Sequence, residues 1–361
     1  MTNKRTCLYD KHVALGALIT PFAGFDMPIQ YTGIIDEHNA VREHCGVFDV
    51  SHMGEVVVSG PDADKYINHI FTNDVNGLAA GKVLYGMICY PDGGVVDDTC
   101  ICKLADQLYL MTINASNIDK DVAWIEQNAE GFNVTIENKS EAYGQLAVQG
   151  TEAEKMLEDV LGLDCKDLKF YEVKCLKQDG VDVIVSRTGY TGEDGFEIYG
   201  TPEYIVKVWD KLMEAGVKPC GLGCRDTLRF EVGMPLYGNE LSDKITPVMA
   251  GLSMFVKFDK DEFIGKEALL KQKKEGVRQR LRGIELDENA IPRHGYKVLK
   301  DGVEVGEVTT GYHLISTDKS CAVALVDESI QMGDRVDIQI RKKTFPGTVV
   351  KKKFYDNHYK K

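Results

Sequence analysis

Two adjacent aspartates, Asp97 and Asp98, lie inside the apolar run Val95–Cys102. Aspartate is depleted in β-strands, and successive strand side chains point to opposite faces, so the two carboxylates must meet different surroundings. One carboxylate can be solvated, whereas the other must point into a covered face or a cleft, where it needs a partner or a shifted pKa. The alternative is a bulge or an edge strand on which both carboxylates are solvated.

A glycine-rich loop over Ser186–Glu197 follows the apolar strand-like run Val183–Ser186. Its three glycines, hydroxyls and acids would allow the backbone to approach a ligand closely. The loop has neither G-x-x-x-x-G-K-[ST] nor G-x-G-x-x-G, so neither a phosphate loop nor a dinucleotide fold is indicated. Considered alone, it could equally be an acidic surface turn.

A third segment, Gly221–Glu231, places two arginines one helical turn apart after a glycine turn. Because residues four apart share a helix face, Arg225 and Arg229 should project to the same side. They could form surface ion pairs with Asp226 and Glu231, which is the commoner fate of such charges. The sharper alternative is that they bind the carboxylate of a ligand.

The overall composition predicts an ordinary soluble globular protein rather than a nucleic-acid or membrane protein. The chain has 361 residues, which favours two or three domains, and 43% of them are hydrophobic. Its net charge of −13 disfavours non-specific binding to nucleic acid or anionic lipid. The apolar stretch near the start is short and broken by Gly16 and Pro21, so it predicts neither a secretory signal nor a membrane span.

Cysteine and histidine usage does not indicate a metal site. Ten cysteines spread over 361 residues, some inside apolar runs, predict reduced and mostly buried thiols in a cytoplasmic protein. No C-x-x-C occurs, and the spacing of the histidines is unlike that of zinc ligands, so we expect no metal. His52 follows Ser51 directly, but a sequential arrangement does not make a catalytic triad, and a turn entering a strand is expected there.

Local patterns predict an α+β protein with antiparallel pairing. A capping box at Thr151–Glu154 starts a helix that Gly162 ends, a second helix runs from Thr201-Pro202 to Gly216, and Ser116 begins a third. Short β-type runs lie between these helices: Glu55–Val58, Val95–Cys102, Leu108–Ile113, Val134–Glu137, Gln145–Val148 and Val183–Ser186. The turn Pro91–Gly94 indicates an antiparallel hairpin.

After about residue 277 the pattern changes to closely spaced strands, which predicts a small all-β sandwich or barrel. The expected strands are Leu281–Leu286, Val303–Thr310, Ala322–Val326, Val336–Ile340 and Gly347–Lys353. The charged stretch Lys271–Arg282 is interpreted as a hinge that leads into this unit.

Five segments in one order resemble the T-protein family of the glycine cleavage system. They are Phe22–Pro28, Phe48–Glu55, Gly93–Asp98, Gly189–Glu197 and Gly221–Arg225. The likeness extends over nearly the whole chain, and the order and spacing of the segments make it specific.

The resemblance implies a three-domain, cloverleaf-like arrangement of mainly antiparallel sheets with packed helices and a C-terminal β-barrel-like domain. The first, folate-binding domain would be discontinuous, with residues 1–50 and 140–245. Residues 51–139 would form the second domain, which carries Asp98. Residues 246–278 would connect these domains to the C-terminal domain, residues 279–361.

By the same resemblance, each candidate residue has an implied role. Asp98 matches the catalytic aspartate, Glu197 the carboxylate that holds the pterin, and Arg225 a folate-binding arginine. The remaining pocket residues would be Met53, Tyr85, Asn114 and Tyr190. A carboxylate suits the pterin because it can accept a ring N–H and the adjacent amino group together.

The implied reaction transfers a one-carbon unit to tetrahydrofolate, which serves as co-substrate. The unit is an aminomethyl group on the lipoyl arm of the lipoylated carrier (H) protein, and the products are 5,10-methylenetetrahydrofolate, ammonia and the dihydrolipoyl carrier. Loss of thiolate and ammonia creates iminium-like cations, which a fixed carboxylate stabilises while it takes a proton from a folate nitrogen. We expect a cytoplasmic monomer without nucleic-acid or membrane partners.

Two places depart from the family pattern, and two related functions remain as alternatives. Gly311–Ser316 lacks the usual Ser-Pro, and the tail Phe354–Lys361 lacks the expected arginine. A folate-dependent demethylase module usually accompanies a flavin domain, but no nucleotide fingerprint precedes residue 50. A non-catalytic folate-binding maintenance protein would carry Lys-Gly-Cys-Tyr-x-Gly-Gln, where this chain has Arg187–Glu193.

Overall fold

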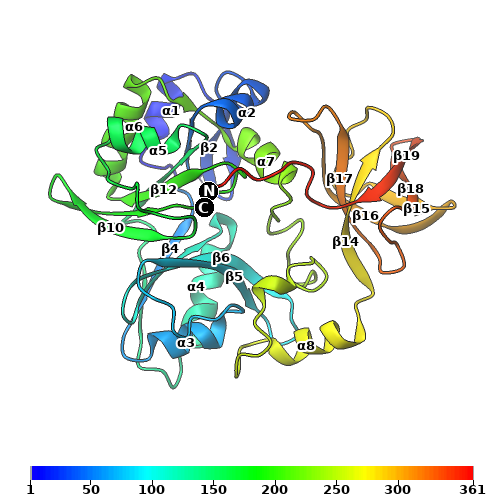
Figure 1. The fold of residues 1–361 in the computed structure, drawn as a ribbon, viewed down its shortest axis with the longest axis horizontal. Coiled ribbons are helices and arrows are strands. Elements are labelled where there is room, and N and C mark those ends of the chain that lie inside the picture. Colours follow the sequence, from blue (N-terminus) through cyan, green and yellow to red (C-terminus); the bar gives the residue numbers. More distant parts are fainter. Residues whose placement is uncertain (1, 361) are drawn as a thin grey trace.

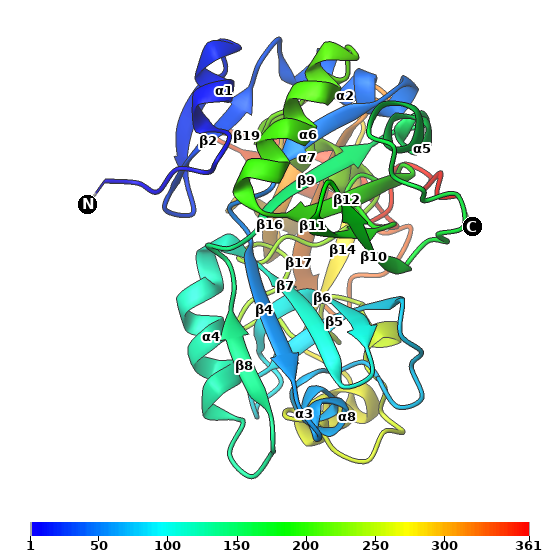
Figure 2. The same ribbon diagram turned by 90° about the vertical axis from the view of Figure 1, so that its left-hand side faces the viewer.

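Three large β-sheets organise the chain, and a computed structural model describes residues 2–360. One sheet has six strands in the order β10-β11-β12-β9-β3-β13, and a second has five in the order β5-β6-β7-β4-β8. The third is a closed barrel in the order β14-β17-β16-β15-β18-β19. Figure 1 shows the first two units stacked on one side and the barrel beside them. The two ends of the chain overlap in that view but lie on opposite faces in Figure 2.

The six-stranded sheet is assembled from segments that are far apart in the sequence. Its strands are β3 (Gly46–Asp49), β9 (Gly144–Gln149), β10 (Val173–Gln178), β11 (Val181–Ser186), β12 (Gly195–Gly200) and β13 (Lys218–Pro219). All neighbours pair antiparallel except β13 and β3, which are parallel. All strands of the five-stranded sheet lie between β3 and β9 in the sequence, so the chain leaves the six-stranded sheet after β3 and returns to it at β9.

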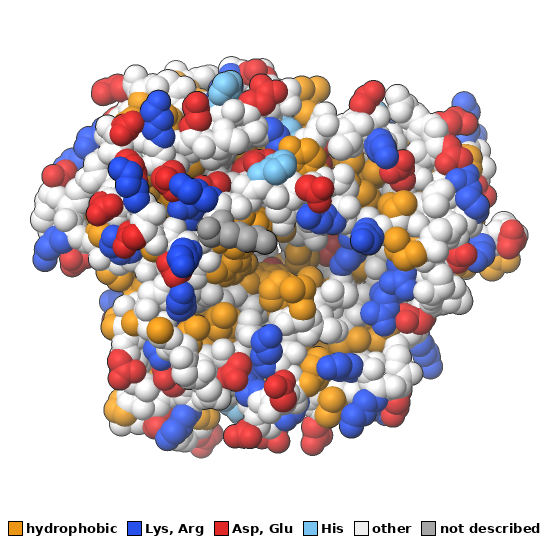
Figure 3. All heavy atoms as spheres, viewed as in Figure 1, with side chains coloured by type: hydrophobic (Ala, Val, Ile, Leu, Met, Phe, Trp, Pro, Cys, Tyr) orange, Lys and Arg blue, Asp and Glu red, His pale blue; other side chains and the backbone are white. Residues whose placement is uncertain are grey.

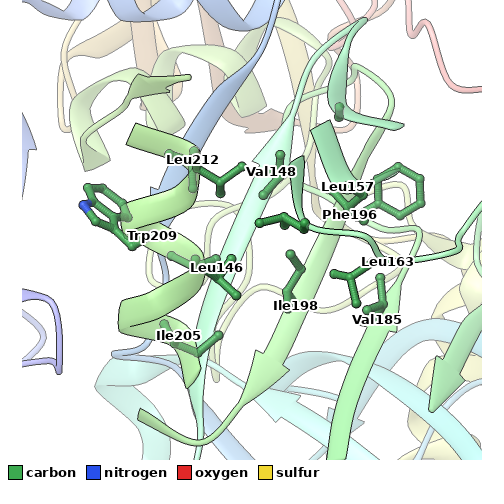
Figure 4. Close-up of a cluster of buried hydrophobic side chains, with 14 of the residues drawn as sticks. Leu146, Val148, Leu157, Leu163, Val185, Phe196, Ile198, Ile205, Trp209 and Leu212 are labelled. Carbon is green, nitrogen blue, oxygen red and sulfur yellow. The ribbon is translucent and has the colours of Figure 1, made fainter. Parts of the chain in front are cut away.

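Helix α6 (Pro202–Glu214) covers one face of the six-stranded sheet and confirms the helix predicted after Thr201. The hydroxyl of Thr201 accepts a hydrogen bond from the amide of Tyr204, which satisfies a free donor at the helix start. Figure 4 shows Ile205 and Leu212 on the side of the helix that faces the strands, whereas Trp209 lies on another side and meets the ring of His12. Gly216, at φ +80°, follows the helix end as expected.

The capping box predicted at Thr151 was wrong, although a helix does follow it. The helix α5 (Ala153–Lys155) continues as a π-helix, Met156–Val160, and has no side-chain cap. The hydroxyl of Thr151 instead donates to the carbonyls of Glu43 and His44, at 3.0 and 3.3 Å. These carbonyls lie at the end of a helix distant in sequence. The Thr151 hydroxyl therefore makes a tertiary contact instead of the helix cap that the local pattern predicted.

The five-stranded sheet confirms the predicted hairpin and all of the predicted runs in this region. Its strands are β4 (Gly54–Ser59), β5 (Lys82–Cys89), β6 (Val95–Ala105), β7 (Leu108–Ile113) and β8 (Thr135–Asn138). Helices α3 (Ala63–Ile70) and α4 (Ile118–Gln127) belong to the same unit. Helix α4 begins two residues later than predicted, because Ala115–Asn117 form a 3-10 turn and Ser116 is exposed.

The C-terminal strands close into the expected barrel. They are β14 (Gln279–Leu286), β15 (Lys297–Lys300), β16 (Val303–His313), β17 (Ser320–Asp327), β18 (Arg335–Ile340) and β19 (Lys343–Val350). Every strand predicted here is present, and the short β15 was missed. Most of the stretch Lys271–Arg282, predicted as a hinge, is regular structure, because its first part ends helix α8 (Lys266–Glu275) and its last part begins β14. Only residues 276–278 separate the two elements, and the lysines of the stretch lie on the helix, which buries Leu269.

The remaining elements are short. They are α1 (Tyr9–Ala14), β1 (Leu18–Phe22), β2 (Phe25–Gln30), α2 (Ile34–Glu43), α7 (Leu222–Glu231) and the 3-10 turn η3 (Ser253–Phe255). No helix in residues 2–360 is long and apolar enough to cross a membrane. All ten cysteines are free and only Cys175 is exposed, as the sequence predicted. The domain boundaries given above stay a prediction.

The two open sheets meet through a shared apolar cluster. Val83 and Leu110 of the five-stranded sheet pack with Val173 and Ile184 of the six-stranded sheet. At the same junction Thr112 and Tyr199 share a hydrogen bond of 3.2 Å between their hydroxyls. The hydrogen bond joins β7 to β12, and three candidate residues lie close to it in the chain: Asp98 on β6, Asn114 directly after β7 and Glu197 on β12.

We predict that Thr201→Ala destabilises the protein by about 1 kcal/mol, because the amide of Tyr204 loses its acceptor. Urea unfolding followed by the fluorescence of Trp209, which lies on α6, measures this change. Thr201→Ser keeps the hydroxyl and is the matched control. Equal stability of Thr201→Ala and the parent protein would show that the cap contributes nothing.

Candidate active site

The carboxylate of Asp98 lies on β6, which is paired with β5 and β7 in the five-stranded sheet. The hydroxyl of Tyr85 donates to its Oδ2 at 2.9 Å, and the Nδ2 of Asn114 donates to its Oδ1 at 3.1 Å. The ring of Phe255 meets the ring of Tyr85 edge-on at 4.9 Å between centroids. Two donors, one on β5 and one directly after β7, thus orient a carboxylate that is only partly buried.

Asp97 points to the opposite face and is completely buried, as strand alternation predicted. Its Oδ2 accepts the backbone N–H of Asn114 at 2.8 Å, and its Oδ1 accepts Nδ2 groups of Asn114 and Asn117 at 2.7 and 2.8 Å. The alternative in which both carboxylates are solvated was therefore wrong. Asn114 contacts both aspartates, so it links the fully buried carboxylate to the partly buried one.

The surroundings of Asp98 favour its protonated form. Burial and the nearby charge of Asp97 raise the pKa of Asp98 from its ordinary value of 3.8 to about 7, against the lowering effect of the Tyr85 and Asn114 hydrogen bonds. Both protonation states are therefore accessible near neutral pH. A carboxyl group with this property can accept and return a proton during a reaction.

The glycine-rich loop is packed into the protein, so the acidic surface turn considered for it was wrong. Gly189 and Gly195 both face the side chain of Gln149, and a Cβ on Gly189 would lie 1.9 Å from its Oε1. Buried Arg187 pairs with Asp194 through two hydrogen bonds, with Nε to Oδ1 at 2.9 Å. The glycines are required because the loop lies directly against another buried side chain.

The loop leads into β12, which carries Glu197 at the edge of the site. The Nε2 of Gln145 donates to its Oε1 at 3.2 Å, and the hydroxyl of Thr188 donates to its Oε2. Glu197 is only partly buried and lies opposite Ser186 and Ala147 in the sheet. Each carboxylate oxygen has one protein donor and retains capacity to accept a second.

The two arginines of α7 have different surroundings. Arg229 is buried and pairs with Asp226 at 2.7 Å and with Glu240 at 2.8 Å. Arg225 has no ion pair within 4.0 Å among the described residues, and its buried Nη1 has no hydrogen-bond partner. Burial lowers the pKa of Arg225, while the charge of Glu197 counteracts this effect. One arginine is thus structural, and the other presents an unused donor beside a carboxylate.

The pairing of Glu231 suggested by sequence spacing was also wrong. Glu231 accepts hydrogen bonds from Arg42 at 2.9 Å and from Ser316, whose N–H and hydroxyl donate at 2.8 and 2.6 Å. His38 Nε2 lies 3.2 Å from the same carboxylate, and these partners lower the pKa of Glu231 to about 2. Ser316, in the segment that departs from the family pattern, therefore connects the barrel to the six-stranded unit.

Tyr190 lies between the two groups of candidate residues. The guanidinium carbon of Arg225 lies 4.9 Å from the centre of its ring, and its hydroxyl donates to the carbonyl of Pro235. Burial and the charge of Asp98 raise its pKa, while Arg225 acts in the opposite direction. Met53 packs at the side of the apolar cluster that includes Phe48 and Leu228.

The structure brings the Asp98 and Glu197 groups near one another. Cys100, two residues after Asp98 and on the same strand face, has its pKa raised by burial and by the charges of Glu197 and Asp98. Figure 3 shows hydrophobic side chains gathered near the centre of the face where the three units meet. The arrangement combines one proton-accepting carboxylate, one hydrogen-bonding carboxylate and one cation with an unused donor.

Several residues that build the site were not predicted. These are Asn117, Asp121, Gln145, Thr188 and Phe255. None has a distinctive local pattern, although Thr188 lies inside the glycine-rich loop. His52 was assigned only to a turn, yet it is buried near Arg225 and next to Phe22, and its burial lowers its pKa to about 4.

The C-terminal segment crosses the loop instead of supplying an arginine. The ring of Tyr355 lies 4.3 Å from the guanidinium carbon of Arg42, and the Nδ1 of His358 lies 3.3 Å from Glu193. The ring of Tyr359 stacks on Phe170 at 4.0 Å between centroids. Within residues 2–360, no group of three or more His, Cys, Asp or Glu side chains is placed to hold a metal ion.

Two family models, several known proteins and a solved structure are similar to this chain. The family model of the GCVT N-terminal domain matches residues 8–260, and that of the glycine cleavage T-protein C-terminal barrel domain matches residues 279–356. The aminomethyltransferases of Caldanaerobacter subterraneus subsp. tengcongensis and Lysinibacillus sphaericus are each 48% identical to it, over 99% and 98% of this chain and 97% and 99% of theirs. A crystal structure of glycine cleavage system aminomethyltransferase T from Bartonella henselae has a TM-score of 0.95 at 31% identity, covering 99% of both chains.

The raised pKa of Asp98 predicts a pH-dependent stability difference between the parent protein and Asp98→Asn. The folded state binds the Asp98 proton more tightly than the unfolded state, so this stabilisation is complete below about pH 4 and is lost as pH rises through about 7. Asparagine never ionises, so the melting temperature of Asp98→Asn should rise relative to the parent over this range and level off above it. Melting curves between about pH 5 and pH 9 measure the difference.

Asp106→Asn, at an exposed carboxylate in the β6–β7 turn, is the matched control and should show no such trend. A melting-temperature difference for Asp98→Asn that stays constant across the range would contradict the raised pKa.

Proposed function

Because the chain belongs to the glycine cleavage T-protein family of aminomethyltransferases, we propose that this site transfers a one-carbon unit to tetrahydrofolate. The donor is the aminomethyl-lipoyl arm of the lipoylated carrier (H) protein, and the products are 5,10-methylenetetrahydrofolate, ammonia and the dihydrolipoyl carrier. The observation that carries the proposal is the buried Nη1 of Arg225, which has no protein partner, in a site that also holds the oriented carboxylates of Asp98 and Glu197. Tetrahydrofolate is a co-substrate, and no metal takes part.

Glu197 holds the pterin ring through its two carboxylate oxygens. Gln145 and Thr188 each donate to one of these oxygens, which fixes the plane of the carboxylate. The remaining lone pairs can then accept the ring N–H and the neighbouring amino group of the pterin as a bidentate pair. Two prearranged acceptors make this geometry specific for a flat heterocycle with adjacent donors.

Arg225 supplies the complementary donor. Its buried Nη1 has no protein partner, which is costly unless a ligand completes it. An acceptor atom of the folate is the natural partner, and Tyr190 positions the guanidinium by lying beneath it. Met53, Tyr85 and Asn114 complete the lining of the pocket.

Asp98 performs the chemistry. Departure of the lipoyl thiolate leaves an aminomethyl cation of iminium character, which one folate nitrogen attacks. Loss of ammonia then gives a second iminium ion, which the other folate nitrogen attacks with loss of its proton to close the methylene bridge. A fixed carboxylate stabilises the positive charge of these species, and Asp98 can also take the proton that the folate nitrogen loses. Tyr85 and Asn114 hold Asp98 in one orientation, so little reorganisation is needed at the moment of reaction.

The two alternative functions are not favoured by a specific observation. A demethylase module would need a flavin partner, and a maintenance protein would carry a cysteine where the loop Arg187–Glu193 has none. The net charge of −13 supports action without nucleic-acid or membrane partners. A monomer in the cytoplasm is the setting we propose for the reaction.

Glu197→Gln should weaken tetrahydrofolate binding by about 1–3 kcal/mol, which is roughly 5- to 150-fold in Kd, because one acceptor becomes an amide donor that faces a donor of the pterin. Isothermal calorimetry measures the change. Glu214→Gln, at the exposed end of α6, is the control and should leave both affinity and stability unchanged. An unaltered Kd for Glu197→Gln would remove Glu197 from the pterin site.

Asp98→Asn should lower the transfer rate by roughly two to four orders of magnitude while the affinity for tetrahydrofolate changes little. The assay follows ammonia and methylenetetrahydrofolate released from an aminomethyl-lipoyl carrier protein. Asp106→Asn is the matched control, whereas Asp97→Asn is not, because Asp97 accepts three hydrogen bonds that position Asn114. Undiminished transfer by folded Asp98→Asn would disprove its catalytic role, and an inactive parent protein would disprove the proposed function.

A further inference from the structure

A second buried acid, Asp121, lies behind Asp97 on the side away from Asp98. It belongs to the first turn of α4 and has no exposed surface. Its carboxyl lies within hydrogen-bonding distance of the Asp97 carboxyl, and neither of its oxygens receives a hydrogen bond from any described residue. Two buried carboxyl groups therefore face each other, and only Asp97 is supplied with donors.

A single proton between the two carboxyl groups removes the repulsion between them. If both groups were ionised, two adjacent negative charges would be buried, and Asp121 would have no donor at all. A single proton converts the contact into an O–H···O⁻ hydrogen bond, which is among the stronger kinds. The proton belongs on Asp121, because Asp97 is already satisfied as an acceptor by Asn114 and Asn117. Burial and the charge of Asp97 accordingly raise the pKa of Asp121 to about 10.

The neighbouring Lys120 does not replace this proton. Its Nζ lies 3.3 Å from Oδ1 of Asp121 but outside hydrogen-bond geometry, and it lowers the pKa of Asp121 less than burial and Asp97 raise it. The ammonium donates instead to the carbonyl of Val96 and, at 3.1 Å, to the hydroxyl of Tyr237, and its side chain is 36% exposed. A partly solvated lysine engaged elsewhere leaves the requirement for a donor at Asp121 unmet.

We propose that Asp121 is a positioning residue for the transfer reaction, donating a hydrogen bond to Asp97 so that Asn114 holds Asp98 in its working orientation. This inference rests on the function proposed above. The Nδ2 of Asn114 donates to Oδ1 of Asp97 at 2.7 Å and to Oδ1 of Asp98 at 3.1 Å. If the amide were flipped, its oxygen would face both carboxylates, so a fixed Asp97 keeps the donor side toward Asp98.

Two variants of Asp121 distinguish the effect of its hydrogen bond to Asp97 from the effect of its packing. Asp121→Asn supplies an amide N–H to Asp97 and should keep kcat within about threefold of the parent. Asp121→Leu fills a similar space without a donor, so kcat should fall by about 10- to 100-fold through misplacement of Asp98, with an unchanged Kd for tetrahydrofolate. Melting curves establish that each variant is folded. Full activity of Asp121→Leu, or equal loss in a folded Asp121→Asn, would overturn the proposal.

An infrared measurement tests the proton without using activity. The parent protein, labelled with ¹³C-aspartate, should show the carbonyl band of a protonated aspartic acid at about pH 8.5, where Asp98 is ionised, and Asp121→Asn should lack it. The label distinguishes this band from that of the buried Glu55. Absence of the band from the parent would overturn the proposal even if Asp121→Leu does not fold. An inactive parent would instead disprove the proposed function and leave the infrared result intact.

Discussion

The burial of Asp97 is the constraint on which the rest of the candidate site depends. A carboxylate without exposed surface must be satisfied by protein donors, and here the donors come from Asn114 and Asn117 at the end of β7 and the start of α4. These contacts hold the Asn114 amide beside Asp98. Together with the burial of Asp98 itself, the negative charge of Asp97 raises the pKa of Asp98 toward neutrality.

The site also requires three units to hold a common geometry. The Thr112–Tyr199 hydrogen bond and the apolar cluster around it join the two open sheets, so Asp98 and Glu197 lie on strands that cannot move independently. Glu231 connects α7 to the barrel through Ser316 and to α2 through Arg42. Arg225 lies on that same helix, so contacts made far from the reacting atoms fix the position of its guanidinium.

Much of the fold could be predicted because it depends on local covalent geometry. Strand alternation predicted that Asp97 and Asp98 face opposite ways, and the Thr201 cap predicted the start of α6. Two of the errors share one physical cause, since the Thr151 hydroxyl donates to carbonyls at the end of α2 and Glu231 accepts from Arg42 and Ser316. Hydrogen bonds to distant segments compete with local ones, and a sequence pattern contains only the local partners.

The sequence alone determined the α+β class, the β-rich C-terminal unit, the strand that carries the two aspartates and the family to which the motifs belong. It did not determine which charged side chains have an ion-pair partner. Arg225 and Arg229 have the same type and share a helix face, yet Glu240 neutralises only Arg229. Similarly, only the packing of α4 against β6 brings Asp121 to Asp97. The energy of a buried charge depends on every group around it, and tertiary structure decides which groups those are.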